Sequence, residues 1–109
     1  MAVFDRFIKM LSDHSIQVRL NFRQDGIALA GKWNFAKIVP REFGFCLLKP
    51  NSRFPQDVLI ECRSAFEKAG ISVKALSGDR FSVQLDNSTL DQGAEALIEF
   101  VRRGVNLED

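Results

Sequence analysis

The apolar residues at the start of the chain recur at intervals of three and four, the spacing of one face of an α-helix. These residues are Val3, Phe4, Phe7, Ile8 and Leu11. Polar side chains lie between them, so the pattern predicts an amphipathic helix that ends near His14. A protonated imidazole is stabilised by the dipole at the C-terminal end of a helix, and we expect His14 to cap the helix there.

From Ser15 the apolar period changes to two, which is typical of a strand with one buried face. The positions expected to be buried are Ile16, Val18, Leu20 and Phe22. The dipeptide Asp25-Gly26 tolerates the positive φ angles of a two-residue turn, so we expect a β-hairpin there. The second strand then runs from Ile27 to about Trp33, with Leu29 in the core.

The segment from Trp33 to Arg41 leaves strand and loop open. An extended chain would place Trp33, Phe35 and Lys37 on one side, and Pro40 would end a strand or hold it at a sheet edge. The apolar run from Phe43 to Leu48 predicts a third strand, and residues 49–52 predict a loop.

The second half of the chain begins with a helical pattern over residues 55–69. Pro55 suits the first turn of a helix, and Gly70 suits its C-terminal cap. The expected buried stripe consists of Val58, Leu59, Cys62, Ala65, Phe66 and Ala69.

Two strands and a helix complete the chain. Ile71 and Val73 open one strand, and Phe81, Val83 and Leu85 form the next. We expect a turn at Ser77-Gly78-Asp79 between them. The capping pair of the last helix is either Thr89 with Gln92 or Ser88 with Asp91, and Gly104 is expected to end that helix.

The predicted order, α-β-β-β-α-β-β-α, indicates a single compact α+β domain over residues 1–109, with helices packed on a mainly antiparallel sheet. The 46% of apolar residues in 109 are enough for one core. No apolar run approaches the roughly 20 residues of a bilayer span, and no charged-then-apolar leader opens the chain. We therefore expect a cytoplasmic protein without membrane contact, in which Cys46 and Cys62 are buried free thiols.

The net charge of +1 conceals a segregation along the chain. Residues 15–54 carry seven basic residues against two acidic ones, whereas residues 55–109 carry six basic against ten acidic. Such a dipolar surface steers a charged partner or a second copy of the chain, although ordinary solvated charge is the simpler interpretation.

The side chains that perform catalysis are few. The chain has one histidine and no tyrosine, no glycine-rich phosphate loop, and no obvious set of metal ligands. We expect no enzymatic activity, no cofactor and no metal. A small enzyme that uses His14 is retained as a remote alternative, for the case in which the fold brings His14 beside a thiol or a carboxylate cluster.

Three large apolar side chains fall outside the expected buried stripes: Phe54, Ile60 and Phe100. Together with Trp33 and Phe35, which also fit core or rim packing, they are the candidate contacts for another protein. The leading hypothesis is a non-enzymatic protein-binding domain, an adaptor, a chaperone-like protein or an inhibitor, forming a homodimer and binding an acidic partner.

The alternative is nucleic-acid binding by the basic hairpin. Its candidate residues are Arg19, Arg23, Lys32, Lys37 and Arg41. Cations interleaved with aromatic residues hold single strands by phosphate contacts and base stacking. Against this interpretation, the chain is close to neutral overall and matches no nucleic-acid-binding motif.

The element order and length resemble those of the small type III secretion chaperones. The resemblance runs from Phe4-Asp5-Arg6-Phe7-Ile8 in the first helix to Ala96-Leu97-Ile98-Glu99-Phe100-Val101 in the last. It implies a homodimer without enzymatic activity that wraps an unfolded segment of a secreted protein over apolar patches. Members of that class tend to be acidic, whereas this chain has a basic middle.

Overall fold

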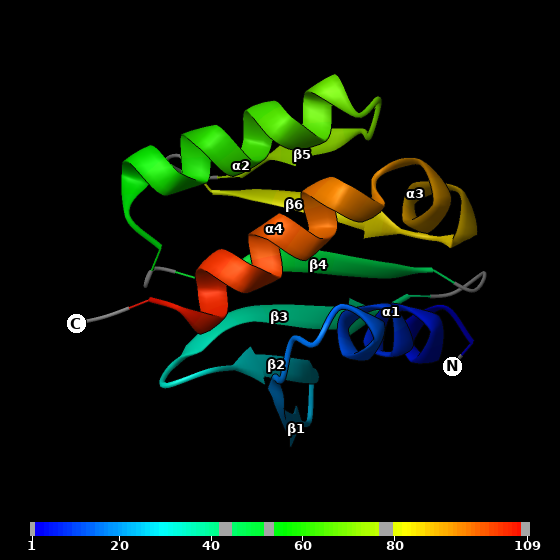
Figure 1. Ribbon diagram of the computed structural model, residues 1–109, viewed down its shortest axis with the longest axis vertical. Coiled ribbons are helices and arrows are strands. Elements are labelled where there is room, and N and C mark those ends of the chain that lie inside the picture. The colour runs from blue at the N-terminus through cyan, green and yellow to red at the C-terminus, as the bar shows by residue number, and fades with distance from the viewer. Residues whose placement is uncertain (1, 42–44, 52–53, 77–79, 108–109) are drawn as a thin grey trace.

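Six strands form one antiparallel sheet in the computed structural model, which describes residues 2–41, 45–51, 54–76 and 80–107 (Figure 1). The strands are β1 (Arg19–Arg23), β2 (Gly26–Ala30), β3 (Asn34–Pro40), β4 (Cys46–Pro50), β5 (Val73–Ala75) and β6 (Phe81–Leu85). The helices of this part of the chain are α1 (Ala2–Asp13), α2 (Gln56–Lys68), α3 (Asn87–Gln92) and α4 (Ala94–Val105). The strands lie in the order β1-β2-β3-β4-β6-β5, and the expected α+β class is confirmed.

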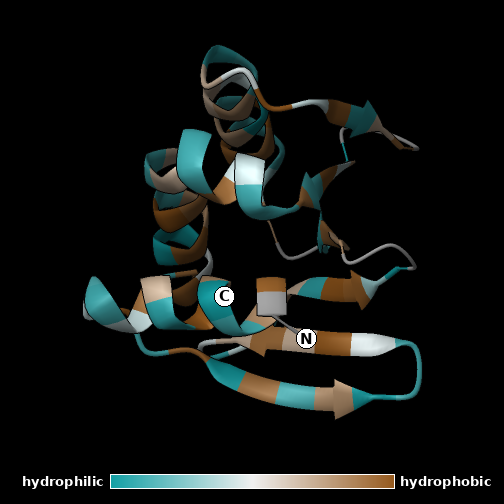
Figure 2. Ribbon diagram, turned by 90° about the vertical axis from the view of Figure 1, so that its right-hand side faces the viewer, coloured by the Kyte–Doolittle hydropathy of each residue, from teal (hydrophilic) through white to brown (hydrophobic). Residues whose placement is uncertain are grey.

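The helices lie on one face of the sheet, as two perpendicular views show (Figure 1 and Figure 2). Buried and more exposed side chains therefore alternate along the strands, because one face of each strand packs against the helices and the other face does not. In β3, for example, Ile38 is buried against the helices, while Lys37 points to the opposite face and is half-buried. Among the described residues, no helix lies on the second face of the sheet (Figure 1 and Figure 2).

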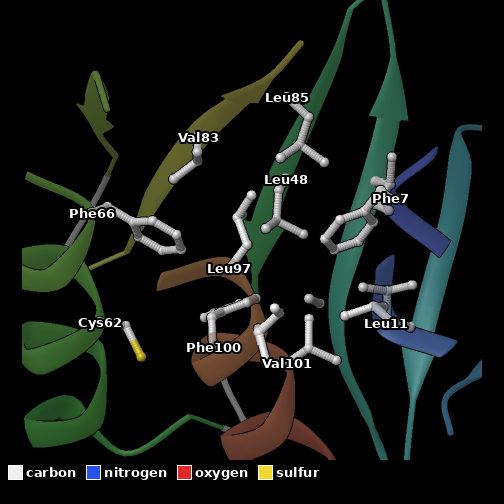
Figure 3. Close-up of a cluster of buried hydrophobic side chains, with 14 of the residues drawn as sticks. Phe7, Leu11, Leu48, Cys62, Phe66, Val83, Leu85, Leu97, Phe100 and Val101 are labelled. Atoms are coloured by element: carbon white, nitrogen blue, oxygen red, sulfur yellow. The ribbon is translucent and has the colours of Figure 1, made fainter. Parts of the chain in front are cut away.

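The core lies between this sheet and the helices (Figure 3). Its centre is a cluster of phenylalanine rings in which Phe100 of α4 stacks on Phe54, with ring centroids 4.9 Å apart. Phe66 of α2 and Phe35 of β3 meet the ring of Phe100 at 5.9 and 6.4 Å. Aromatic pairs in this distance range contribute beyond the area that they bury.

The prediction that Phe54 and Phe100 lie on the surface is therefore wrong, since their exposed fractions are 4% and 1%. Phe35 is also fully buried. The physical reason is that α4 packs against both α2 and β3, so its apolar arc is wider than a single stripe. Phe35 turns inward because the pairing of β2 with β3 shifts register between Leu29 and Ala30.

The hairpin forms one residue earlier than expected. Arg23 pairs with Gly26, so the two turn residues are Gln24 and Asp25. Gly26 belongs to β2, where a Cβ atom would lie 2.6 Å from the carbonyl oxygen of Ile38. Phe22, expected in the core, is 73% exposed because β1 is the outermost strand of the sheet.

Other boundaries differ in the middle of the chain. The undecided segment after Trp33 is strand β3, and β4 extends through Lys49 and Pro50, where a loop was expected. Gly70 follows α2 with a φ of +80°, which confirms the expected glycine cap. The expected turn at residues 77–79 lies outside the described residues.

The expected last helix is two helices, separated at Gly93. The cap of α3 is Asp86, which neither expected capping pair included. The Asp86 carboxylate accepts a hydrogen bond from the Thr89 backbone N–H, and the Thr89 hydroxyl accepts one from the Asp86 backbone N–H, both at 2.8 Å. The helix-ending role expected for Gly104 is also wrong, because α4 continues through it to Val105.

Asp86→Ala is expected to lower the free energy of unfolding by about 1 kcal/mol at neutral pH. The backbone hydrogen bond from Thr89 and the side-chain hydrogen bond from Gln84 hold the pKa of Asp86 below its usual value. The stabilisation is therefore fully present above the unfolded pKa of about 3.9 and is lost as the pH falls through the lower folded pKa. Urea unfolding of both proteins between neutral and acid pH measures this difference.

Asp86→Asn is the matched control, because asparagine caps a helix as well as aspartate does but does not ionise. The asparagine variant should keep most of the free energy of unfolding at neutral pH, and the loss of that free energy at acid pH should disappear. A neutral-pH loss with asparagine as large as that with alanine would contradict the capping role.

Candidate functional site

The face of the sheet without helices gathers cationic side chains from four of its strands or their ends. They are Arg19 and Arg23 of β1, Lys37 of β3, Arg41 just after β3, Lys49 of β4 and Lys74 of β5. Lys37 pairs directly with Lys49 across the ladder, and the backbone N–H of Arg41 donates to the carbonyl of Phe45 at 3.0 Å. We call these six residues and the surface between them the basic sheet face.

Side chains of β1 and β3 reach over β2 on this face. Lys37 Nζ pairs with Asp25, and the hydrogen bond from Lys37 lowers the pKa of that carboxyl. Asn21 donates to Asn34 Oδ1 at 2.8 Å, and the Arg19 guanidinium donates to the Gly31 carbonyl at 2.6 Å. These contacts are possible because the outward residues of β2 are small: Gly26, Ala28 and Ala30.

The other four cations form no ion pair among the described residues, although Arg23 lies close enough to Asp25 to help lower the pKa of that carboxyl. No carboxylate in that part of the chain lies within ion-pair distance of Arg23, Arg41, Lys49 or Lys74. Four like charges on one sheet face repel one another, and an incoming negative charge relieves that repulsion.

Charges on the helical side are arranged differently, because many of them are paired within the chain. Arg6 pairs with Asp91, and Arg63 pairs with Glu67 along α2. Arg103 of α4 reaches Glu61 of α2 at 2.6 Å. The charge segregation seen along the sequence therefore becomes a difference between two faces of the molecule.

A shallow hollow of about 420 Å³ lies at the β5 side of the basic sheet face. Its apolar lining comes from Phe45, Leu47, Val73 and Leu76, and its polar lining from Ser72, Ser82 and Gln84. Arg41, Lys49 and Lys74 line the same hollow, and no acidic side chain of the described residues does. The hollow thus combines apolar surface with three positive charges.

The structure brings together four of the five residues named for nucleic-acid binding. Arg19, Arg23, Lys37 and Arg41 share the basic sheet face, whereas Lys32 lies between β2 and β3 with its Nζ 5.9 Å from the Trp33 ring centroid. Sequence reasoning missed Lys49 and Lys74. If the predicted strand had been extended to Pro50, Lys49 would have been placed on the same face as the other cations. Lys74 lies in the acidic half of the sequence, where no local pattern connects it to the hairpin.

Of the five residues named for protein contact, Ile60 is the clearly exposed one, with 55% of its surface accessible. It lies on α2 beside Arg63, Ser64, Glu67 and Lys68. Trp33 is half-buried. Phe35, Phe54 and Phe100 belong to the core and are not available to a partner.

His14, the residue named for the remote enzyme alternative, lies at the end of a helix. The Nδ1 atom of His14 lies 2.9 Å from the Met10 carbonyl oxygen at the end of α1, as expected for a capping histidine. His14 lines a surface groove that also includes Glu95 and Glu99. Glu99 pairs with Arg102 and Arg103, and no ion pair joins His14 to a carboxylate of the described residues.

Both cysteines are buried free thiols, as expected. Burial raises the pKa of the Cys46 thiol and raises that of Cys62 to about 11. A thiol with a raised pKa carries little of the thiolate form that attacks electrophiles. Within the described residues, no group of three or more histidine, cysteine, aspartate or glutamate side chains is placed to hold a metal ion.

Comparisons with protein-family models, with curated proteins and with solved structures each gave no match. In the part of the chain that the structure describes, no helix has both the length and the apolar character needed to cross a bilayer.

Proposed function

We propose that the protein is a non-enzymatic protein-binding domain that captures an acidic partner protein through the basic sheet face. The observation that carries this proposal is the set of four cations, Arg23, Arg41, Lys49 and Lys74, on a sheet face that no helix covers. Adaptors, secretion-chaperone-like proteins and inhibitors are the classes that fit such a domain. The two free thiols suit a reducing compartment, and we place the protein in the cytoplasm.

Nucleic-acid binding is the competing function, and the position of Arg19, Arg23, Lys37 and Arg41 on one face favours it. Sequence-tolerant binding of single strands also needs aromatic rings on which bases stack. Among the described residues, Phe45 is the aromatic side chain that lines the hollow, so the hollow offers one ring rather than a series of rings for stacking. Apolar surface beside cations suits an acidic protein better than a phosphate backbone.

Capture from a lysate of the source cells tests the two functions together. The wild-type protein, a face variant with Arg23→Glu and Lys49→Glu, and a control variant with Lys9→Glu and Lys68→Glu are used as baits. Lys9 and Lys68 are exposed lysines of α1 and α2, so the control places the same number of new negative charges on the helical side. Each lysate is divided into nuclease-treated and untreated halves.

The proposal expects an acidic protein that the wild-type and control baits retain after nuclease treatment, that the face variant loses, and that high salt elutes. Equal capture by the face variant would contradict it. Material that disappears on nuclease treatment would assign the basic sheet face to nucleic acid instead.

We also propose that the protein is a homodimer that meets its second copy at α2. Ile60 is exposed there beside Arg63 and Glu67, which carry opposite charges and pair with each other along the helix. Around a two-fold axis such a surface is self-complementary, because each Arg63 approaches the Glu67 of the other copy.

Ile60→Asp is therefore expected to convert a dimeric mass into a monomeric one without a change in the thermal midpoint of the isolated chain. Light scattering after size exclusion measures the mass. Phe22→Asp is the matched control, because Phe22 is a large apolar residue that is also exposed, on the edge strand β1. A monomeric wild type, or a dimer that only Phe22→Asp dissociates, would contradict the α2 interface.

A further inference from the structure

The hollow on the basic sheet face has a definite internal arrangement. Leu47 of β4 lies opposite Gln84 of β6 in the ladder, and Lys74 of β5 lies opposite Ser82. Ser82 is 3% exposed, so its side chain belongs to the floor of the hollow, whereas Lys74 is exposed. The sheet itself therefore forms the floor, and cationic side chains stand around it.

The apolar side chains lie at both ends of this floor, with Phe45 and Leu47 toward the level of Gln84 and Leu76 at the level of Arg80. Phe45 and Leu47 are half-buried although no helix lies over them, and Leu76 is 36% exposed. A surface with several neighbouring apolar side chains gains free energy when another apolar group covers it. The floor accordingly favours a ligand that carries apolar side chains.

The charges around the floor determine the other property of the ligand. Arg41, Lys49 and Lys74 line the hollow without an acidic partner among the described residues. Long cationic side chains reach to a neighbouring carboxylate while their stems cover apolar surface. An uncharged or basic segment would leave these cations without compensation.

We propose that the hollow binds a short acidic segment of the partner protein, with an apolar side chain on Phe45 and Leu47 and carboxylates beside Arg41, Lys49 and Lys74. This inference rests on the proposed function and identifies the part of the basic sheet face that recognises the partner. Arg19, Arg23 and Lys37 lie outside the hollow and attract the acidic partner at longer range.

Amide chemical shifts measured during peptide titrations test this assignment. The first probe is a synthetic peptide of aspartate and glutamate with one central phenylalanine. The second probe replaces the phenylalanine by serine, and the third replaces the acids by their amides. A single-stranded oligothymidylate is the fourth probe.

The first peptide is expected to shift the amides of Leu47, Lys74, Leu76 and Ser82 more than those of α2 and α4. The serine peptide should bind about fivefold more weakly, and the amide peptide should produce no saturable shift. Shifts that are spread evenly over the molecule, or equal affinity for the first two peptides, would overturn the proposal. Stronger shifts of the same amides by the oligothymidylate would assign the hollow to nucleic acid.

Variants of the hollow give a second measurement with matched controls. Lys74→Glu replaces one attraction by a repulsion and should weaken binding of the first peptide roughly tenfold, whereas Lys68→Glu on α2 should not. Leu47→Ser should weaken it about fivefold, whereas Phe22→Ser, at an exposed apolar residue outside the hollow, should not. Wild-type affinity in both hollow variants would overturn the proposal.

Capture of the partner by three variants distinguishes an error in the assignment of the hollow from an error in the proposed function. If Arg23→Glu lowers capture of the partner but Lys74→Glu and Leu47→Ser do not, the basic sheet face binds the partner outside the hollow. If none of the three changes capture, the proposed function itself is wrong.

Discussion

Replacing Phe100 by alanine is expected to lower the free energy of unfolding by about 3–5 kcal/mol. The ring is 1% exposed and lies against Phe54, Phe66 and Phe35, which come from the loop before α2, from α2 and from β3. Its removal leaves a cavity where α4 meets both α2 and the sheet. A domain of this size has a total stability of about 5–15 kcal/mol, so the change removes a large part of it.

Urea unfolding followed by circular dichroism measures this loss. Phe22→Ala is the control, because Phe22 is 73% exposed and its truncation should change stability little. If the alanine variant does not fold, Phe100→Leu keeps more of the apolar volume and still shows a loss. A loss at Phe100 no larger than that at Phe22 would contradict the position of Phe100 in the core.

Gly104→Ala is expected to lower the free energy of unfolding by about 1–3 kcal/mol. A Cβ atom at this position would lie between 2.2 and 2.6 Å from ring atoms of Phe35, so either the ring or α4 must move. In an exposed helix the same substitution would stabilise the protein by up to about 1 kcal/mol, because alanine has the higher helix propensity. The substitution therefore lowers the free energy of unfolding at Gly104, whereas it would raise that free energy in an exposed helix.

A double-mutant cycle identifies the cause. In a Phe35→Leu background the steric conflict is reduced, and Gly104→Ala should destabilise the protein less than it does in the wild type. An increase in stability from Gly104→Ala alone, or the same loss in both backgrounds, would contradict the contact between Gly104 and the Phe35 ring.

The parts of the fold that sequence reasoning predicted are those governed by local rules. The glycine cap at Gly70 and the helix that it ends follow from residues within that segment, and the structure confirms them. Gly104 shows the limit of such rules. Its role depends on Phe35, which lies far away in the sequence and turns inward only because of a register shift between two strands.

Burial of aromatic residues was the least predictable property. Phe22 fits the alternation of a half-buried strand, yet it is exposed because β1 has a neighbour on only one side. Phe100 lies off the stripe of a single helix, yet it is buried because α4 has neighbours on two sides. In both cases the burial of the side chain depends on which elements pack against its own helix or strand, and the periodicity of the sequence does not predict that packing.

The candidate site was predictable in part. Basic residues concentrated in one half of the sequence indicated a charged surface, and four of the five named cations lie on the basic sheet face. Lys74 joins them only because β5 and β6 place their outward residues on the same face as β4. The hollow was missed for the same reason, since its lining residues from β4, β5 and β6 come together only through sheet pairing.

The measurement that tests the central claim most directly is a map of amide chemical-shift changes when the captured partner is added to the protein. The account predicts that the changes gather on the basic sheet face, around Lys37, Lys49 and Lys74. Raised salt should reduce the changes, because the attraction is between exposed charges. Changes gathered around Ile60 on α2, with the sheet amides unaffected, would contradict the account.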